Sequence, residues 1–424
     1  MRPEEVAAVL APTGGAHPGL GRVRWLLERL GCPEPAFPTI AVGGTNGRGA
    51  VLALLESVLS AAGIGVGTFS PCDPAGPVAG VRVGGSAVGE ERLWALVAEA
   101  ILPLDELVSG PGRPTLPEAV AAAAFAHFAR EGVELALVEA PQGGRHDPAV
   151  SLSQPLLSLV APVEEDSRGR FGPGVGQAAW EEADLARPGV PFLTTEGKGE
   201  VLAAFAHRCR EVGAALVLVD STEMEPLELT WERAVWRSRS DPLGLGVFES
   251  GLLGVHQGPS LALALGGLAE LVGGIPLARD AVREGLASAR CPAWFEVIST
   301  RPYLVLEGTQ NPAGARALLS SLDRLPHPRG RRRLMFGAQR GRLVRDMAEI
   351  LFPWFGEVAF VSSGSPDEVP AQALLPQARR LGVPGRVIGE PREVLTDLAE
   401  EDLLVVYGPP AVAREVRGVL AKLA

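Results

Sequence analysis

The sequence predicts an α/β fold with two domains. Strand-length runs of Val, Leu and Ile alternate with helical patterns along the whole chain of 424 residues. Continuous apolar strands between helices are typical of a parallel sheet that helices cover on both faces. The length also exceeds the roughly 100 to 200 residues of a common domain. We therefore predict domains at residues 1–290 and 291–424, with a boundary near residues 289–292, where a helix ends and a proline follows.

The first domain is expected to alternate strands with helices in chain order. The predicted strands are PTIAVGG, VELALVEAP, LLSLVAP and VPFLTT, and the predicted helices are VLALLESVLSAAG, PEAVAAAAFAHFAREG, QAAWEEADLARPG and GEVLAAFAHRCREVG. The texture changes over residues 227–254, where alternating segments with Trp predict a small antiparallel patch. A pair of helices is expected to follow at residues 259–289.

The second domain is expected to hold a second series of strands with helices between them. The predicted strands are YLVLEG, RRRLMFGA, GEVAFVSS, GRVIG and DLLVVYG. This order again favours a parallel sheet, in a domain smaller than the first.

Composition excludes several classes of protein. A net charge of −11 disfavours nucleic acid as a partner, because proteins that bind its backbone usually carry a basic stripe. The first residues have neither a basic region nor an apolar run long enough for a secretory signal, so we expect a cytoplasmic protein. The most hydrophobic window, residues 259–278, contains Glu270 and several glycines and is expected to be a buried helix, without any membrane span.

The stretch IAVGGTNGRGA, residues 40–50, predicts a strand, a glycine-rich turn and a helix. Gly43, Gly44, Gly47 and Gly49 permit backbone conformations closed to other residues. A helix that begins near Gly49 would point its free N–H groups and positive dipole end at the turn, which favours an anion there. The alternative is a tight turn that holds no ligand.

Carboxylates follow two of the predicted strands. Glu139 closes one strand, and Glu164, Glu165 and Asp166 follow the next. The carboxyl ends of parallel strands face the ligand crevice of an open sheet, so these groups are expected near the glycine turn. Oxygen ligands beside a phosphate site suggest Mg²⁺. For Glu164 and Glu165, a role as acidic helix caps is the alternative.

The motifs together resemble a known family. The order IAVGGTNGRGA, FSPCDP, VELALVEAPQGGRHD, AWEEADLARPGVP, GVHQGPS, CPAWFEVI and LVLEGTQNP, from residue 18 to the end, resembles the folylpolyglutamate synthase/dihydrofolate synthase family of the Mur ligase superfamily. The resemblance implies a P-loop-type ATPase-like N-terminal domain and a Rossmann-like C-terminal domain. It also implies that ATP phosphorylates a carboxylic acid to an acyl phosphate, which the amine of glutamate then attacks.

The resemblance further implies a set of site residues. Phosphate binding falls on Gly44, Thr45, Asn46, Gly47, Arg48, Gly49 and Asn311; the magnesium ligands would be Ser70, Glu139 and Asp166, or Ser167 in place of Asp166 with one residue of gap; substrate contacts would be Arg145, Asp147, His256 and Gln257. Glu182 stands where the family has a carbamylated lysine. Either it substitutes for that charge, and we then expect it to act with Arg48 as a catalytic residue, or its presence there is incidental.

Several positions depart from the family pattern. Arg48 and Ala50 replace the lysine and serine of GTNGKGS, while Ser260, Trp294, Glu307 and Gln310 replace groups that hold the base and ribose of ATP. Three hypotheses therefore remain open. The chain is an ATP-dependent ligase that adds glutamate or another amino acid to a folate-like acid, with altered or weakened activity; it is a ligase for another acid; or it is a non-catalytic relative that acts as a binding or regulatory protein.

Overall fold

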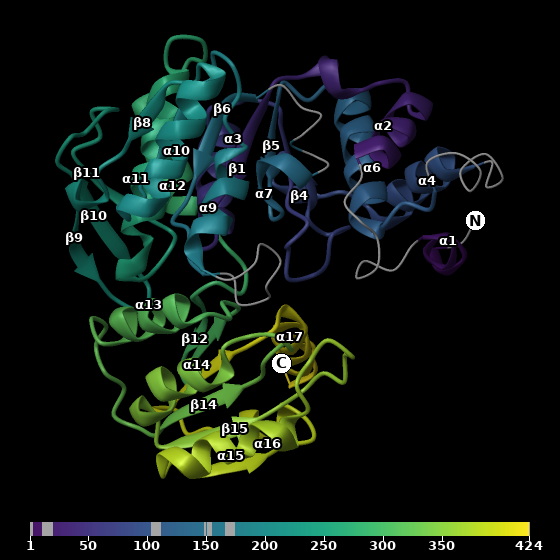
Figure 1. Ribbon diagram of the computed structural model, residues 1–424. Helices are drawn as coiled ribbons and strands as arrows, with labels where there is room; N and C mark the ends of the chain where they lie inside the picture. The colour runs from purple at the N-terminus through teal and green to yellow at the C-terminus, as the bar shows by residue number, and fades with distance from the viewer. Residues whose placement is uncertain are drawn as a thin grey trace.

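The chain forms two lobes (Figure 1). A computed structural model describes residues 3–10, 20–102, 112–147, 150, 155–165 and 174–423. The upper lobe in Figure 1 contains the N-terminal part of the chain, and the lower lobe contains the C-terminal part from residue 296 onward. No helix within the described ranges is long and apolar enough to span a membrane.

The sheet of the upper lobe has a parallel centre and an antiparallel edge. Among the described residues it holds eight strands in the order β4-β3-β2-β5-β1-β6-β7-β8. Their bounds are β1 (Thr39–Gly43), β2 (Val66–Phe69), β3 (Val81–Val83), β4 (Ser86–Ala87), β5 (Leu135–Glu139), β6 (Pro155–Val160), β7 (Phe192–Thr194) and β8 (Leu216–Leu218). The antiparallel pairs are β2 with β3 and β3 with β4. The strands β2, β3, β4 and β8 are additions to the predicted set, and each has four residues or fewer.

Helices cover both faces of this sheet. They are α1 (Pro3–Val9), α2 (Leu20–Arg29), α3 (Arg48–Ala61), α4 (Glu90–Ile101), α6 (Leu116–Glu131), α7 (Gly143–His146), α9 (Val175–Ala183), α10 (Gly199–Val212), α11 (Gly258–Leu271) and α12 (Arg279–Ser288), with short 3-10 turns η1 (Glu34–Ala36), η2 (Ser221–Glu223) and η3 (Val255–Gln257). The central strand β1 alternates between two cores: Ala41 packs into one, while Ile40 and Val42 pack into the other. A strand buried on both faces is the reason for its uninterrupted apolar sequence.

A small antiparallel sheet lies in the segment where the sequence texture changes. It contains β9 (Met224–Leu229), β10 (Ala234–Ser238) and β11 (Val247–Ser250), with β10 in the middle. Trp236 of β10 is 1% exposed and packs into the same core as Ile40. The small sheet is therefore anchored to the upper lobe.

The lower lobe contains a six-stranded sheet within the described part of the chain, in the order β12-β13-β17-β14-β15-β16. The strands are β12 (Glu296–Thr300), β13 (Tyr303–Glu307), β14 (Arg332–Phe336), β15 (Glu357–Phe360), β16 (Gly385–Val387) and β17 (Leu403–Tyr407). The helices are α13 (Pro312–Leu322), α14 (Val344–Leu351), α15 (Ala371–Leu381), α16 (Arg392–Leu395) and α17 (Pro410–Leu423), with the 3-10 turn η4 (Phe352–Trp354). The strands β13 to β17 are those the sequence predicts. The edge strand β12, antiparallel to β13, is an addition to the predicted set.

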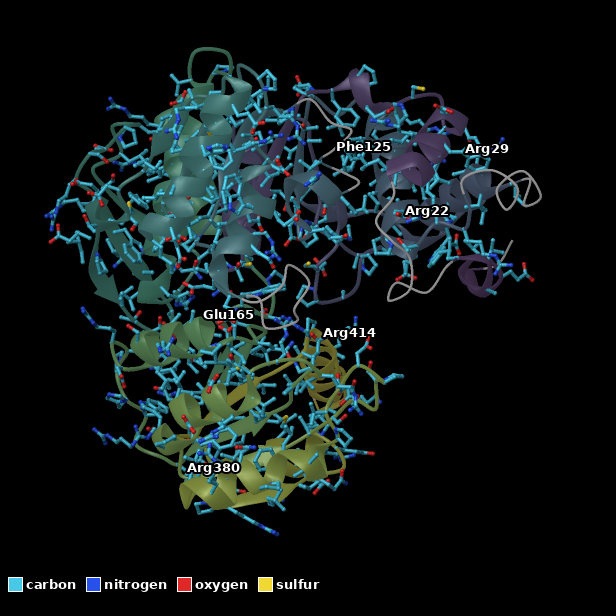
Figure 2. The ribbon with its side chains drawn as sticks, in the orientation of Figure 1. Arg22, Arg29, Phe125, Glu165, Arg380 and Arg414 are labelled. Atoms are coloured by element: carbon cyan, nitrogen blue, oxygen red, sulfur yellow. The ribbon has the colours of Figure 1, made fainter. Side chains whose placement is uncertain are left out.

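The two lobes touch at several places. The Trp231 indole N–H donates to the carbonyl of Pro326 (2.7 Å), and the Arg414 Nη1 donates to the carbonyl of Pro74 (3.0 Å). Figure 2 shows Arg414 on the side of the lower lobe that faces the upper lobe. Since α12 ends at Ser288 and β12 begins at Glu296, the chain passes between the lobes within this interval. The exact division at residue 290 stays a prediction.

Candidate functional site

The glycine turn lies at the carboxyl end of β1, in the middle of the upper sheet. Gly44 and Gly47 have φ angles of +105° and +94°, a region that favours glycine. A Cβ atom on Gly44 would lie only 2.3 Å from the carbonyl oxygen of Ala161, in the loop after β6. Gly47 is the N-cap residue of α3, so the first N–H groups of that helix open onto the turn. The predicted strand, turn and helix are thus present, with the helix beginning at Arg48.

The turn is also tied to the neighbouring strand. The N–H groups of Thr45 and Asn46 donate to the carbonyl of Pro162 at 3.0 and 3.3 Å. The Thr45 hydroxyl donates to the carbonyl of Glu164 (3.1 Å) and accepts from its N–H (3.0 Å). These bonds hold the turn against the loop after β6. The N-terminus of α3, with the side chain of Arg48, faces the pocket between the lobes.

Arg48 folds back into the turn that carries it. Its Nε donates to Glu139 Oε1 at 2.8 Å, and its Nη1 donates to the carbonyls of Gly44 and Thr45, the latter at 3.2 Å. Burial lowers the pKa of Arg48, but the charge of Glu139 and its other acidic neighbours more than offset this effect, so the pKa lies above its usual range. The side chain is a permanent cation at the centre of the turn.

Glu139 has both carboxylate oxygens occupied. While Oε1 accepts from Arg48, Oε2 accepts from the Ser70 hydroxyl at 2.6 Å, and Glu139 is only 2% exposed. The predicted magnesium ligands Ser70 and Glu139 are thus in contact, and Asp166 and Ser167 lie outside the described residues. In the described ranges no group of three or more His, Cys, Asp or Glu side chains could hold a metal ion. Within the described residues, the arrangement around Glu139 fits a bound guanidinium better than Mg²⁺, because both carboxylate oxygens accept from donors.

Glu182 enters the same cavity from the end of α9. It is 2% exposed, and its negative charge contributes to the raised pKa of Arg48. A Cβ atom on Gly43 would lie 2.5 Å from Glu182 Oε2 and 2.2 Å from a methyl carbon of Leu185. Gly43 therefore has a packing role in the turn: its missing side chain makes room for Glu182.

Two pockets share the glycine turn. The larger has a volume of about 270 Å³, and its walls come from both lobes: Gly44, Thr45, Asn46, Arg48, Phe69, Pro71, Cys72, Pro117, Pro141, Gln142, Asp147, Glu182, Trp294, Gly308, Thr309, Gln310, Asn311, Arg342 and Pro410. The smaller, of about 160 Å³, is lined by Thr45, Asn46, Gly47, Arg48, Gly49, Ala50, Cys72, Glu139, Pro162, His256, Gln257, Pro259, Ser260, Trp294, Glu307, Thr309, Gly314, Ala317 and Leu318. Six residues line both pockets: Thr45, Asn46, Arg48, Cys72, Trp294 and Thr309. Of these, Cys72 and Thr309 have no role predicted from the sequence, and Trp294 is predicted only to replace a group that holds the base and ribose of ATP.

A reciprocal amide pair joins the turn to the lower lobe. The Asn46 Nδ2 donates to Asn311 Oδ1 (3.1 Å), and the Asn311 Nδ2 donates to Asn46 Oδ1 (2.8 Å). Asn311 is also the N-cap of α13, where its Oδ1 accepts from the N–H of Gly314. Both asparagines were predicted to bind phosphate. Their pairing across 265 residues is a feature that no sequence pattern could indicate.

His256 and Gln257 lie in the turn η3 and line the smaller pocket. The His256 Nδ1 lies 2.6 Å from the Ser321 hydroxyl, and its Nε2 lies 3.1 Å from the Gln257 amide nitrogen. Burial lowers the pKa of His256 to about 4, so this imidazole is neutral at pH 7. Both ring nitrogens are already hydrogen-bonded, so the ring offers a ligand a packing surface without a positive charge.

The two predicted substrate residues of the GGRHD segment line different pockets. Asp147 is buried and lines the larger pocket beside the turn. Arg145 instead lines a separate pocket of about 340 Å³ with Asp184, Arg187 and Arg208. Since α7 separates neighbouring side chains in this way, only Asp147 is in place to contact a ligand of the larger pocket.

Two of the positions that depart from the family pattern, Glu307 and Gln310, are buried at the cleft, Glu307 at the smaller pocket and Gln310 at the larger. Glu307 accepts from the N–H groups of Phe295 (3.1 Å) and Thr309 (2.8 Å), and burial raises its pKa to about 7. Gln310 is also buried and accepts from the N–H of Gln339 (2.8 Å), so its carbonyl oxygen serves a loop of the lower lobe. Both side chains therefore accept hydrogen bonds from neighbouring backbone N–H groups.

The fold and the site define a class. Two α/β lobes, with a glycine turn at the end of a central parallel strand and a ligand cleft walled by both, form the two-domain architecture of the Mur ligase superfamily. No family model matches the chain. The dihydrofolate synthase/folylpolyglutamate synthase of Bacillus subtilis is 28% identical over 314 residues, 73% of each chain. That of Mycobacterium tuberculosis is 27% identical over 421 residues, 91% of this chain and 84% of the relative.

Solved structures agree with these relatives. A crystal structure of folylpolyglutamate synthase from Thermotoga maritima matches with a TM-score of 0.81 and 26% identity, over 96% of this chain and 94% of that one. Escherichia coli FolC in complex with DHPP and ADP matches with a TM-score of 0.82 and 25% identity, over 99% and 97% of the two chains. Over most of its length the chain is homologous to these proteins named folylpolyglutamate synthase and dihydrofolate synthase.

Proposed function

We propose that the chain is an ATP-dependent ligase that joins an amino acid, glutamate in the first instance, to a folate-like carboxylic acid. One observation carries the proposal: Arg48 and Glu182 face the same cavity at the end of α3, and walls from both lobes surround it. A helix N-terminus with a cation beside it is a favourable place for the phosphates of a nucleotide. The names of the relatives and the ADP in the Escherichia coli complex support the assignment.

The proposed reaction has two steps. A carboxylate oxygen of the acid attacks the γ-phosphorus of ATP, which gives an acyl phosphate and ADP. The amine of the amino acid then attacks the acyl carbon, phosphate leaves, and the nitrogen loses a proton as the amide forms. In this scheme Arg48 stabilises the charge on the transferred phosphoryl group, which is where fixed cations contribute most to phosphoryl transfer.

Glu182 is assigned the task of orienting groups in the cavity. It lies beside Gly43 and contributes to the field at Arg48, so it can hold the guanidinium or the incoming ammonium group in place. A carboxylate at this position needs no carbamylation to carry its charge.

We also propose that the chain divides into a nucleotide-binding part, residues 1–290, and a smaller C-terminal part, residues 291–424. The glycine turn and α3 lie in the first part, and both parts contribute walls to the cleft.

The test is an assay of the full chain with ATP, glutamate and a panel of carboxylic acids that begins with dihydropteroate and reduced folates. ADP release that depends on the acid, together with a glutamylated product in the mass spectrum, is the expected result. Glu182→Gln should lower the rate of acid-dependent ADP release by about 10²-fold, which is the lower limit of the effect expected from a positioned ionisable group. The matched control is Glu200→Gln, because Glu200 is exposed on α10. ATP binding without any acid-dependent ADP release would favour the non-catalytic relative.

A further inference from the structure

Glu139 already has a cation as its partner. Its two oxygens accept from Arg48 Nε at 2.8 Å and from the Ser70 hydroxyl at 2.6 Å, and it is 2% exposed. A divalent ion at Glu139 Oε1 would compete with Arg48 for that oxygen, and Arg48 would then stand beside the ion as a like charge that has lost its partner. Because the guanidinium and the carboxylate are both charged, the existing contact is of the charge-assisted kind.

The turn holds the guanidinium at this place. Nη1 of Arg48 donates to two carbonyls of the same turn, those of Gly44 and Thr45, while Nε is committed to Glu139. The remaining nitrogen, Nη2, points to the sulfur of Cys72 at 3.9 Å, a weak acceptor. A phosphate oxygen is a far stronger acceptor for Nη2 than sulfur, and Arg48 and Cys72 both line the two pockets of the cleft.

A lysine could not make these contacts together. Its ammonium group is a point charge with three donors at the end of a flexible stem, whereas the planar guanidinium presents five donors along a fixed fork. With these five donors one guanidinium contacts two backbone carbonyls and the buried carboxylate, while its Nη2 points to the sulfur of Cys72. Arginine at position 48 therefore carries the same charge as a lysine but is held by the turn and by Glu139 at once.

We propose that Arg48 serves as the built-in counter-ion of Glu139, so that the cleft binds the phosphates of a nucleotide without a divalent cation. This inference rests on the proposed function for the identity of the ligand as ATP. It assigns the charge neutralisation of the bound triphosphate to Arg48 and to the first N–H groups of α3.

The experiment is calorimetric titration of the full chain with ATP, once in excess EDTA and once in excess MgCl2. We expect the two dissociation constants to agree within about threefold. The variant Arg48→Lys, which returns a point charge to the turn and frees an oxygen of Glu139, is expected to bind ATP at least about tenfold more tightly with Mg²⁺ than with EDTA. Arg210→Lys is the matched control, because Arg210 is exposed at the end of α10.

Three results separate this inference from the proposed function. ATP binding by the unmodified chain that is at least tenfold tighter with Mg²⁺ would overturn the inference and leave the ligase proposal standing. ATP binding in neither condition would overturn both. Equal binding with no acid-dependent ADP release would support the inference and contradict the ligase proposal. If Arg48→Lys does not fold, judged by circular dichroism, the comparison on the unmodified chain decides the question by itself.

Discussion

The pair formed by Arg48 and Glu139 should be one of the most strongly coupled in the upper lobe. The side chains are 17% and 3% exposed, and Arg48→Met would leave Glu139 with the Ser70 hydroxyl as the remaining donor in contact. Loss of one member of a buried ion pair costs about 3–5 kcal/mol of unfolding free energy. Because Arg48 keeps some contact with water, we expect a value near the lower limit, about 3 kcal/mol.

The coupling between the two side chains is measured with the double variant Arg48→Met/Glu139→Gln. The amide of Gln carries no charge and can still accept from Ser70, so the double variant should cost clearly less than the sum of the two single variants. We expect a coupling energy of about 2 kcal/mol, from urea unfolding followed by circular dichroism with each transition fitted separately. Single-variant costs that add to within about 0.5 kcal/mol would refute the buried pair.

Three further predictions concern the surroundings of the pair. Asn46→Ala removes both hydrogen bonds between the Asn46 and Asn311 amides and should loosen the contact between the lobes. We expect faster proteolysis of the native chain and a larger radius of gyration in solution scattering. An unchanged radius of gyration would contradict the role of the amide pair. Gly43→Ala places a methyl group 2.2 Å from Leu185 and should destabilise the upper lobe by about 1–3 kcal/mol in urea unfolding, whereas an effect below about 0.5 kcal/mol would show that the turn can move. Burial raises the pKa of Glu307 from 4.5 to about 7, so its contribution to the free energy of unfolding is complete below about pH 4.5 and is lost as the pH rises through 7, by about 3 kcal/mol in total. The variant Glu307→Gln should therefore show a flatter dependence of stability on pH in this range. Parallel pH profiles for the variant and the unmodified chain would contradict the raised pKa of Glu307.

Much of the architecture could be predicted from the sequence, because the relevant signals are local. The uninterrupted apolar residues of β1 and β5 reflect burial on both faces of the sheet. The strands β13, β14, β15 and β17 of the lower lobe are also mostly buried and were predicted for the same reason. The sequence did not predict strands such as β8, which has three residues, and the edge strand β12, which is half-buried along its length. Such segments show no clear periodicity of apolar residues.

The site was predicted in part. Ser70, Glu139 and Arg48 were named as site residues from the sequence, and the structure brings Arg48 and Ser70 into contact with Glu139. Arg145 was expected beside the substrate, but the short helix α7 directs it to a separate pocket. A spacing of two residues from Asp147 does not determine which side of such a helix each side chain faces.

The sequence by itself determined where a turn for an anion could form, since the glycines at positions 44 and 47 and the helix that follows are local features. The tertiary structure alone decided what that turn contains. Arg48 pairs with a carboxylate 91 residues away because β1 lies beside β5 in the sheet, and the order of strands is a property of the whole lobe. The ends of adjacent parallel strands must meet at one edge, and there a guanidinium and a buried carboxylate lower each other's cost of burial.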